Sequence, residues 1–129
     1  MNKLFGIIVT TSYVAAEFAL TLPSWFEIID PQNKKYQSII ESSVDKGEAS
    51  AIALAIEFDE SLLIIDDLKG RRFAQNLGLN ITGTIGIIVE AKLLGFIPSV
   101  GEIITKIRET DFRISEKIEL IALKKAGEL

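Results

Sequence analysis

Two adjacent carboxylates, Asp66 and Asp67, directly follow four apolar residues, 62–65, and precede a glycine and two arginines. A continuous apolar run of this length is typical of a strand buried on both faces in a parallel sheet. Such sheets place their chemistry at the carboxyl ends of the strands, where these aspartates lie. Because side chains alternate along a strand, only one of the two can face the crevice, and the other is suited to cap the next helix. A strand end followed by a helix cap is the plainer alternative.

Two further carboxylates stand out by their position. Glu17 is the only charged residue within 7–26, and buried carboxylates are rare unless they are paired or bound to metal. Glu48 lies near the start of an alanine-rich helical stretch, three residues after Asp45. The plainer explanations are a solvated edge for Glu17 and a capping box with Asp45 for Glu48. Gathered carboxylates repel one another unless a cation lies among them, and Mg²⁺ or Mn²⁺ prefers oxygen ligands. The candidate metal ligands are Glu17, Glu48, Asp66 and Asp67.

The composition excludes several kinds of chemistry. The sequence has no cysteine, which excludes disulfides and thiolate metal sites and suits a reducing cytoplasm. It also has no histidine, so the usual zinc ligand, the Ser-His and Cys-His pairs and the common general base near neutral pH are missing. Any catalysis must use carboxylates, lysines, hydroxyl groups or a metal held by oxygen.

Size and charge limit the architecture and the partners. We expect residues 1–129 to form a single domain, which is long enough for a core of its own. Because 48% of the residues are hydrophobic and only 8% are aromatic, aliphatic side chains must dominate that core. The net charge of -4 argues against a broad electrostatic surface for nucleic acid, but it leaves room for a local basic rim around an acidic site.

Residues 7–26 come close to the length of a membrane span. Hydroxyl-bearing residues and a proline interrupt this stretch, and Glu17 at its centre would be costly in lipid. Apart from Lys3, no basic region of signal-peptide type precedes it. We therefore expect no membrane association and a cytoplasmic protein.

Short apolar runs alternate with helix-forming stretches along the chain. The expected strands are 6–9, 25–29, 62–65 and 80–82. The expected helices are 11–20, 30–44, one that begins at Asp45, 69–77, 84–94, 99–110 and 115–126, with Asp30 and Thr84 among the caps. The helix after Asp45 is expected to bury Ala49, Ile52, Ala53 and Ile56. Strands that alternate with helices predict an α/β protein with a three-layer fold and a mainly parallel central sheet flanked by helices.

Three sequence blocks carry a resemblance to a known family. They are VDKGEASAIALAIEF, LLIIDDLKGRRFAQNLGL and TGTIGIIVEAKLLGFIPSV. In order and spacing they resemble one branch of the PIN-domain proteins, with its GEA-x-AI-x-LA helix, its DD-x-x-GR block and its GT-x-G…AK-x-x-G-x-I stretch. PIN domains are typically metal-dependent ribonucleases, and many are toxins of toxin–antitoxin pairs. The acidic positions of the family carry over to Glu17, Glu48 and Asp67, with Asp66 beside the last.

The sequence departs from the family pattern at its start. The family normally opens with a strand that ends in an aspartate, followed by one or two helices, and this chain begins where that opening would have finished. The resemblance therefore implies that the first metal-binding aspartate and the central strand are missing. We expect a PIN-like fold that is N-terminally truncated, and a homo-oligomer that satisfies the strand edges left open.

The resemblance implies an endoribonuclease that depends on Mg²⁺ or Mn²⁺, with Glu48 and Asp67 as catalytic carboxylates and with activity impaired by the missing aspartate. The metal would activate a water for attack on an RNA phosphodiester. The candidate phosphate contacts are Lys69, Arg71, Arg72, Thr84 and Lys92. A solvated helix face explains the two arginines equally well, and helix capping explains Thr84.

Two other functions remain open. A non-catalytic interaction module would keep the scaffold and bind a partner chain, such as an antitoxin, or a second copy of itself. A phosphoacceptor signalling domain could also use an acidic pair, a threonine and a lysine, although the Gly-Arg after the pair has no obvious role there. Binding of Mn²⁺ and cleavage of single-stranded RNA separate the first two hypotheses, and acid-labile phosphorylation would identify the third.

Overall fold

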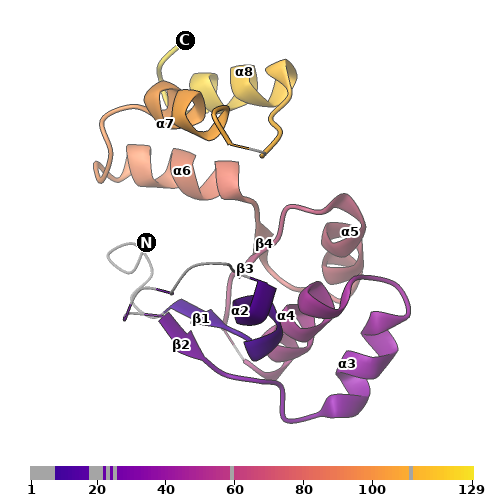
Figure 1. Cartoon of the computed structure of the whole chain (residues 1–129). Helices are drawn as coiled ribbons and strands as arrows, with labels where there is room; N and C mark the ends of the chain where they lie inside the picture. Colours follow the sequence, from indigo (N-terminus) through magenta and orange to yellow (C-terminus); the bar gives the residue numbers. More distant parts are fainter. Residues whose placement is uncertain (1–7, 18–21, 23, 25, 59, 111) are drawn as a thin grey trace. The chain divides into compact units, whose positions relative to one another are not determined.

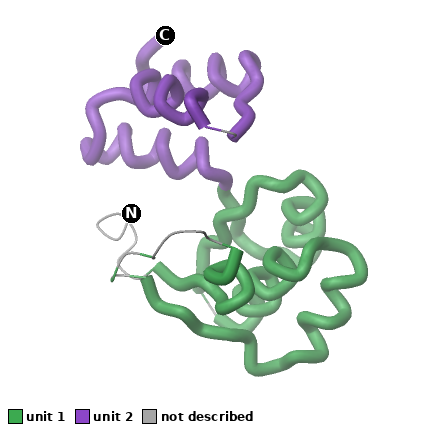
Figure 2. Tube along the Cα trace, viewed as in Figure 1, with its two compact units in different colours: residues 1–82 green, residues 83–129 purple. Residues whose placement is uncertain are grey.

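The computed structural model describes residues 8–17, 22, 24, 26–58, 60–110 and 112–129. The chain divides into two compact units, residues 1–82 and 83–129, which are described separately below (Figure 2). The expectation of a single domain over residues 1–129 stays a prediction. Within the described part of the chain, no helix is long and apolar enough to span a membrane.

The first unit alternates strands and helices, as expected from the sequence (Figure 1). Its strands pair in parallel, β1 with β2 and β3 with β4. The predicted α/β class with parallel strands is therefore confirmed. Among the described residues the strands form two separate pairs rather than one continuous sheet. The elements are β1 (Ile8–Thr10), α2 (Ser12–Glu17), β2 (Phe26–Ile28), α3 (Lys34–Glu41), α4 (Lys46–Glu57), β3 (Leu63–Ile64), α5 (Leu68–Asn76) and β4 (Ile81–Thr82).

The helix expected to begin at Asp30 begins four residues later. Asn33 is its N-cap, and the Asn33 side chain accepts hydrogen bonds from the N–H groups of Lys35 and Tyr36. The Asp30 carboxylate instead accepts from the N–H and the hydroxyl of Ser12, at the start of α2. These bonds lower the pKa of Asp30. An Asp-Pro pair does favour a helix start, but here the aspartate makes a tertiary contact.

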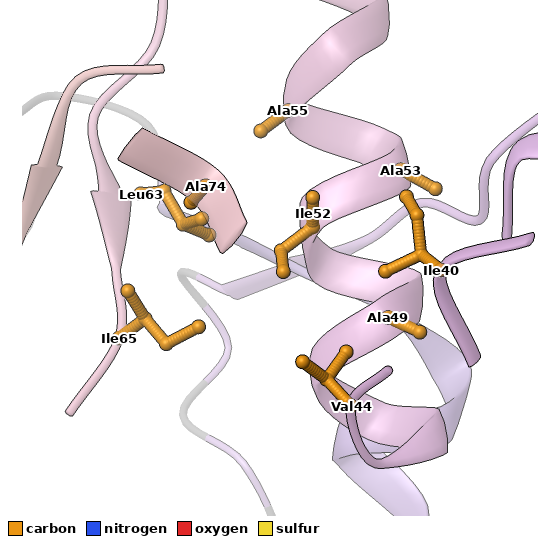
Figure 3. Close-up of a cluster of buried hydrophobic side chains, with 9 residues drawn as sticks. All are labelled: Ile40, Val44, Ala49, Ile52, Ala53, Ala55, Leu63, Ile65 and Ala74. Carbon is orange, nitrogen blue, oxygen red and sulfur yellow. The ribbon is translucent and has the colours of Figure 1, made fainter. Parts of the chain in front are cut away.

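Helix α4 supplies the centre of the core of the first unit. Ala49, Ile52 and Ala53 are fully buried, as predicted, whereas Ile56 is 37% exposed, against prediction. Figure 3 shows Ile52 between Leu63 and Ile65 on one side and Ile40 of α3 on the other. The full cluster comprises Ile40, Val44, Ala49, Ile52, Ala53, Ala55, Leu63, Ile65 and Ala74. Truncating a buried isoleucine to alanine in such a core typically costs about 2–5 kcal/mol, so this packing holds the start of α4 in place.

The elements of the second unit are all helices among its described residues. It contains α6 (Thr84–Leu93), α7 (Val100–Ile107) and α8 (Glu116–Lys125). Ser99 and Ser115 cap α7 and α8, as their positions predict, and Gly95 has the positive φ of 82° that ends α6. Thr84 is not the cap of α6, because Gly83 occupies that position. The shared core is formed by Val89, Val100, Ile104, Ile114, Ala122 and Ala126.

Candidate functional site

Glu48 lies in the first turn of α4, and one of its carboxylate oxygens is buried. That atom, Oε2, has no hydrogen-bond partner among the described residues. Burial raises the pKa of Glu48, and the nearby carboxylates of Asp67, Asp45 and Glu17 raise it further. The capping-box explanation loses support, since the Asp45 side chain makes no capping hydrogen bond although Asp45 is the N-cap of α4. A half-buried carboxylate that has one unpartnered oxygen and lies among other carboxylates is costly in the free protein.

Two glycines allow the carboxylates to approach the helices closely. A Cβ atom on Gly70 would lie 2.7 Å from Oε2 of Glu48, and one on Gly47 would lie 2.6 Å from Oε1 of Glu17. Real Cβ atoms essentially never come this close to a carboxylate oxygen. A side chain at Gly70 would therefore displace the Glu48 carboxylate from its place against α5. The packing of Glu48 and Glu17 depends on bare backbone at these two positions.

Asp67 combines the two roles that the sequence divided between the aspartates. It is the N-cap of α5, and its Oδ2 atom accepts a hydrogen bond of 3.0 Å from the Gly70 N–H. Gly70 is also the residue against which Glu48 lies, and Asp67 is the carboxylate that most strongly raises the pKa of Glu48. Asp66 is exposed and is not among the groups that shift this pKa. These contacts link Asp67 to Glu48, and the assignment of Asp66 as a metal ligand stays a prediction.

A hydrogen-bond chain joins the start of α2, the helix that carries Glu17, to the first turn of α4. The hydroxyls of Thr11 and Ser50 are buried and 2.6 Å apart, and the Ser50 hydroxyl donates to the carbonyl of Gly47. The Thr11 Oγ1 atom also accepts from the Val14 N–H, so Thr11 caps α2. Glu17 is the last residue of α2, and residues 18–20 of the expected helix lie outside the described residues. Glu17 is exposed, yet its carboxylate lies against Gly47 and close enough to raise the pKa of Glu48.

The carboxylates have the right ligand atoms for a hard divalent cation, but in the described structure their positions do not form a site around one. All donors are oxygen atoms, one of them is buried without a partner, and bare glycine backbone holds two of the carboxylates close. Among the described residues, however, no three acidic side chains converge closely enough to form a complete metal site. The acidic cluster, defined as Glu17, Glu48 and Asp67, thus offers suitable ligands that the described structure does not bring together around one point.

The candidate phosphate contacts of the first unit lie on α5. Arg71 is half-buried, and its Nη1 atom donates a 2.8 Å hydrogen bond to the carbonyl of Ile65, just beyond β3. This bond ties α5 to the strand end, so a purely solvated face does not describe Arg71. Lys69 and Arg72 are exposed. The three residues therefore place positive charge on the helix that Asp67 caps.

The remaining two candidates belong to the second unit. Lys92 forms a 2.9 Å ion pair with Glu128. The Glu128 carboxylate also accepts from Ser99 and from the N–H groups of Val100 and Gly101. Lys92 therefore already has an anionic partner. Thr84 is the first residue of α6, following the Gly83 cap.

Asp45, Gly47 and Gly70 were missed as parts of the site. Both glycines lie in the first turns of helices, in the similar contexts Lys-Gly-Glu and Lys-Gly-Arg. Glycine within a helix costs roughly 0.5–1 kcal/mol relative to alanine, so each position needs a compensating reason. Close approach of a side chain is such a reason, and this signal could have been read from the sequence.

Residues 1–128 match a family model described as a PIN domain, DUF3368. Because the match covers nearly the whole chain, the protein belongs to this PIN-domain family, and it has a nuclease-type fold. The resemblance stated from the three sequence blocks is thereby confirmed at the level of the family. No curated protein and no solved structure matches the chain.

Proposed function

We propose that this protein is a metal-dependent endoribonuclease of PIN type, with Glu48 and Asp67 as its catalytic carboxylates. The buried, unpartnered oxygen of Glu48 is the observation that carries the proposal. Burial, and then three neighbouring carboxylates, raise the pKa of Glu48, and a bound cation would relieve the repulsion among these carboxylates. Membership of a PIN-domain family with a nuclease-type fold supplies the reaction class.

In the proposed mechanism, Glu48, Asp67 and Glu17 would hold Mg²⁺ or Mn²⁺ once their side chains move closer together than in the described structure. A bound ion would supply an activated water and would stabilise negative charge on the scissile phosphate. Asp67 uses one oxygen to accept from the Gly70 N–H, so the other oxygen is the one left for a cation. We propose that Asp66 interacts with the ion from further away than these three carboxylates. Binding the ion requires Glu48 to be ionised, so metal affinity should rise with pH.

The positive residues are proposed to orient the RNA. Arg71 is held against the Ile65 carbonyl through one nitrogen, and the rest of its guanidinium fork can contact phosphate. Lys69 and Arg72 are exposed on the same helix and could bind neighbouring phosphates. A phosphate contact by Lys92 would have to compete with Glu128, and we propose Thr84 only as a hydroxyl donor to phosphate.

Cleavage of single-stranded RNA by the full chain tests this proposal. Purified protein is incubated with a labelled oligonucleotide in Mn²⁺, with EDTA as the blank. We expect metal-dependent cleavage that falls by at least about 100-fold in Glu48→Gln, because the variant removes a ligand charge from the ion. Glu60→Gln, an exposed carboxylate of the same unit, is the matched control and should cleave like the wild type. Equal cleavage by Glu48→Gln and the wild type would refute the assignment of the site.

A non-catalytic interaction module is the second candidate function. Parallel sheets are normally covered on both faces, yet Ile64 of β3 and the neighbouring Leu62 are 38% and 43% exposed. Each sheet has only two strands among the described residues, which leaves edges that another chain could pair with. The partner would be a second copy of the chain or an antitoxin-like protein.

The oligomeric state tests this second candidate. Light scattering coupled to size exclusion should show a dimer or larger assembly that Ile64→Lys dissociates. Leu120→Lys, at an exposed position of α8, serves as the control. A monomer at all concentrations, together with metal-dependent cleavage, would exclude self-association as the function.

A further inference from the structure

A tyrosine ring and two lysines meet beside the acidic cluster. The ammonium nitrogen of Lys46 lies 4.9 Å from the centroid of the Tyr13 ring, and that of Lys34 lies 5.8 Å from it. Tyr13 is half-buried on α2, and both lysines are exposed. The three residues come from the starts of three different helices, so the tertiary fold rather than local sequence brings them together.

The helix dipole disfavours the positions of these lysines. Lys34 and Lys46 are the first residues of α3 and α4, and Lys35 follows in the same first turn. A cation at a helix N-terminus opposes the helix dipole at a cost of typically 0.3–1 kcal/mol. Within the described part of the chain, none of the three forms an ion pair. Their charges therefore remain available to an external anion.

Two acidic groups close to the start of α3, Asp30 and Glu57, are already engaged in hydrogen bonds. Asp30, whose pKa Lys34 helps to lower, accepts from the N–H and hydroxyl of Ser12. The two oxygens of Glu57 accept from the backbone N–H groups of Gln32 and Asn33. A shallow surface hollow lies at the start of α3, where it is lined by Gln32, Asn33, Lys34 and Lys35. The surface thus has a positive rim over a hollow, although the whole chain is acidic.

This surface adjoins the acidic cluster directly. Tyr13 and Glu17 are four residues apart on α2, so their side chains project from the same side of the helix. Lys46 immediately precedes Gly47, against which the Glu17 carboxylate lies. A strand of RNA whose phosphate reached the acidic cluster would therefore have its neighbouring nucleotides within reach of Tyr13 and the lysines.

We propose that Tyr13, Lys34 and Lys46 form a binding subsite for single-stranded RNA. The Tyr13 ring stacks on an unpaired base, and the two ammonium groups leave the ring to contact the flanking phosphates. Aromatic rings interleaved with cations are the usual means of binding single strands without sequence readout. The subsite deepens the proposed ribonuclease function and rests on it, because it assigns the position of substrate beside the cleavage centre.

Binding of a fluorescent single-stranded RNA oligonucleotide to the full chain, measured by anisotropy in EDTA, tests the subsite without cleavage. Base stacking is worth about 1–3 kcal/mol, so Tyr13→Leu should weaken binding by about 5- to 150-fold. Tyr13→Phe keeps the ring and should bind within about twofold of the wild type. The Tyr13→Leu and Tyr13→Phe pair separates stacking from packing, because both variants keep an apolar side chain in a half-buried position.

The salt dependence of binding tests the lysines. Each phosphate contact on a single strand contributes about 0.7 to the slope of log K against log salt. The double variant Lys34→Gln/Lys46→Gln should lower this slope by about 1.4. The control is Lys117→Gln/Lys124→Gln on α8, where both lysines are exposed, and it should leave the slope unchanged.

The outcomes separate the subsite from the nuclease proposal. RNA binding that needs Tyr13 and the lysines, without cleavage in Mn²⁺, would uphold the subsite and refute the nuclease. Cleavage by the wild type, with unchanged binding in Tyr13→Leu and in the double lysine variant, would refute the subsite alone. Competition by an acidic peptide as effective as competition by unlabelled RNA would also overturn it, because charge without stacking would then explain the binding.

Discussion

At the scale of single residues, the burial of Glu48 has a consequence for stability. Its pKa is raised in the folded protein, first by burial and then by its acidic neighbours. A carboxyl group with a raised pKa binds its proton more tightly in the folded state, so the stability of the metal-free protein falls as pH rises from the unfolded-state value toward the folded one. Ionisation of Glu48 therefore lowers the free energy of unfolding of the metal-free protein.

We predict that Glu48→Gln raises the stability of the metal-free protein at pH 7, because it removes a buried charge that repels three other carboxylates. The gain should disappear near pH 4, where Glu48 is protonated in the wild type. Urea denaturation in EDTA at both pH values measures it, with Glu60→Gln as the control. A loss of stability at pH 7 would show that the Glu48 charge is compensated within the protein.

At this scale the sequence singled out residues that the structure brings near one another, but it assigned two helix caps wrongly. Asp67 and Glu48 were identified from their positions after an apolar run and at a helix start. The helical glycines Gly47 and Gly70 did indicate a close approach of other side chains. Which carboxylate lies against each of them, and that Asp45 acts on Glu48, depends on how the helices pack, which spacing within one element cannot reveal. Asp30 and Thr84 both fit local capping rules. In the structure, however, Asp30 accepts hydrogen bonds from Ser12, and Gly83 is the N-cap of α6.

At the scale of elements, the contact between α4 and α5 depends on Gly70. A Cβ there would lie 2.7 Å from Oε2 of Glu48 and 2.6 Å from Cδ1 of Ile65. Although alanine favours helices more than glycine does, we predict that Gly70→Ala destabilises the protein by about 1–3 kcal/mol through overpacking. Gly47→Ala should cost less, because the exposed Glu17 side chain can move away. Thermal denaturation of the two variants compares them, and a stabilised Gly70→Ala would contradict the packing described here.

The order and type of the elements followed from the sequence more closely than their ends did. Alternating apolar runs and helical stretches predicted the order of strands and helices in the first unit, and parallel pairing was confirmed. The strand expected over 62–65 is shorter, Leu63–Ile64. The division of the strands into two pairs could not be predicted, because the partner of a strand is fixed by packing between residues distant in sequence.

At the scale of the whole molecule, the end of the chain is tied to the second unit through Glu128. Hydrogen bonds from Lys92 and from the backbone of Val100 and Gly101 lower the pKa of Glu128 to about 2. A lowered pKa gives stability that is present above the unfolded-state value of 4.5 and is lost as pH falls toward about 2. We predict that acid weakens this unit between these values, and that Glu128→Gln removes that part of the pH dependence. Helical circular dichroism during acid titration measures it, and identical titrations would contradict the role of Glu128.

The central claim is that the acidic cluster binds a divalent metal ion, and calorimetric titration of the full chain with Mn²⁺ tests it most directly. The wild type and the control Glu60→Gln should bind Mn²⁺ with equal affinity. Asp67→Asn keeps a side chain that can cap α5 but removes a ligand charge, so it should weaken binding by about tenfold or more. Unchanged Mn²⁺ affinity in Asp67→Asn, or no binding by the wild type, would contradict the account.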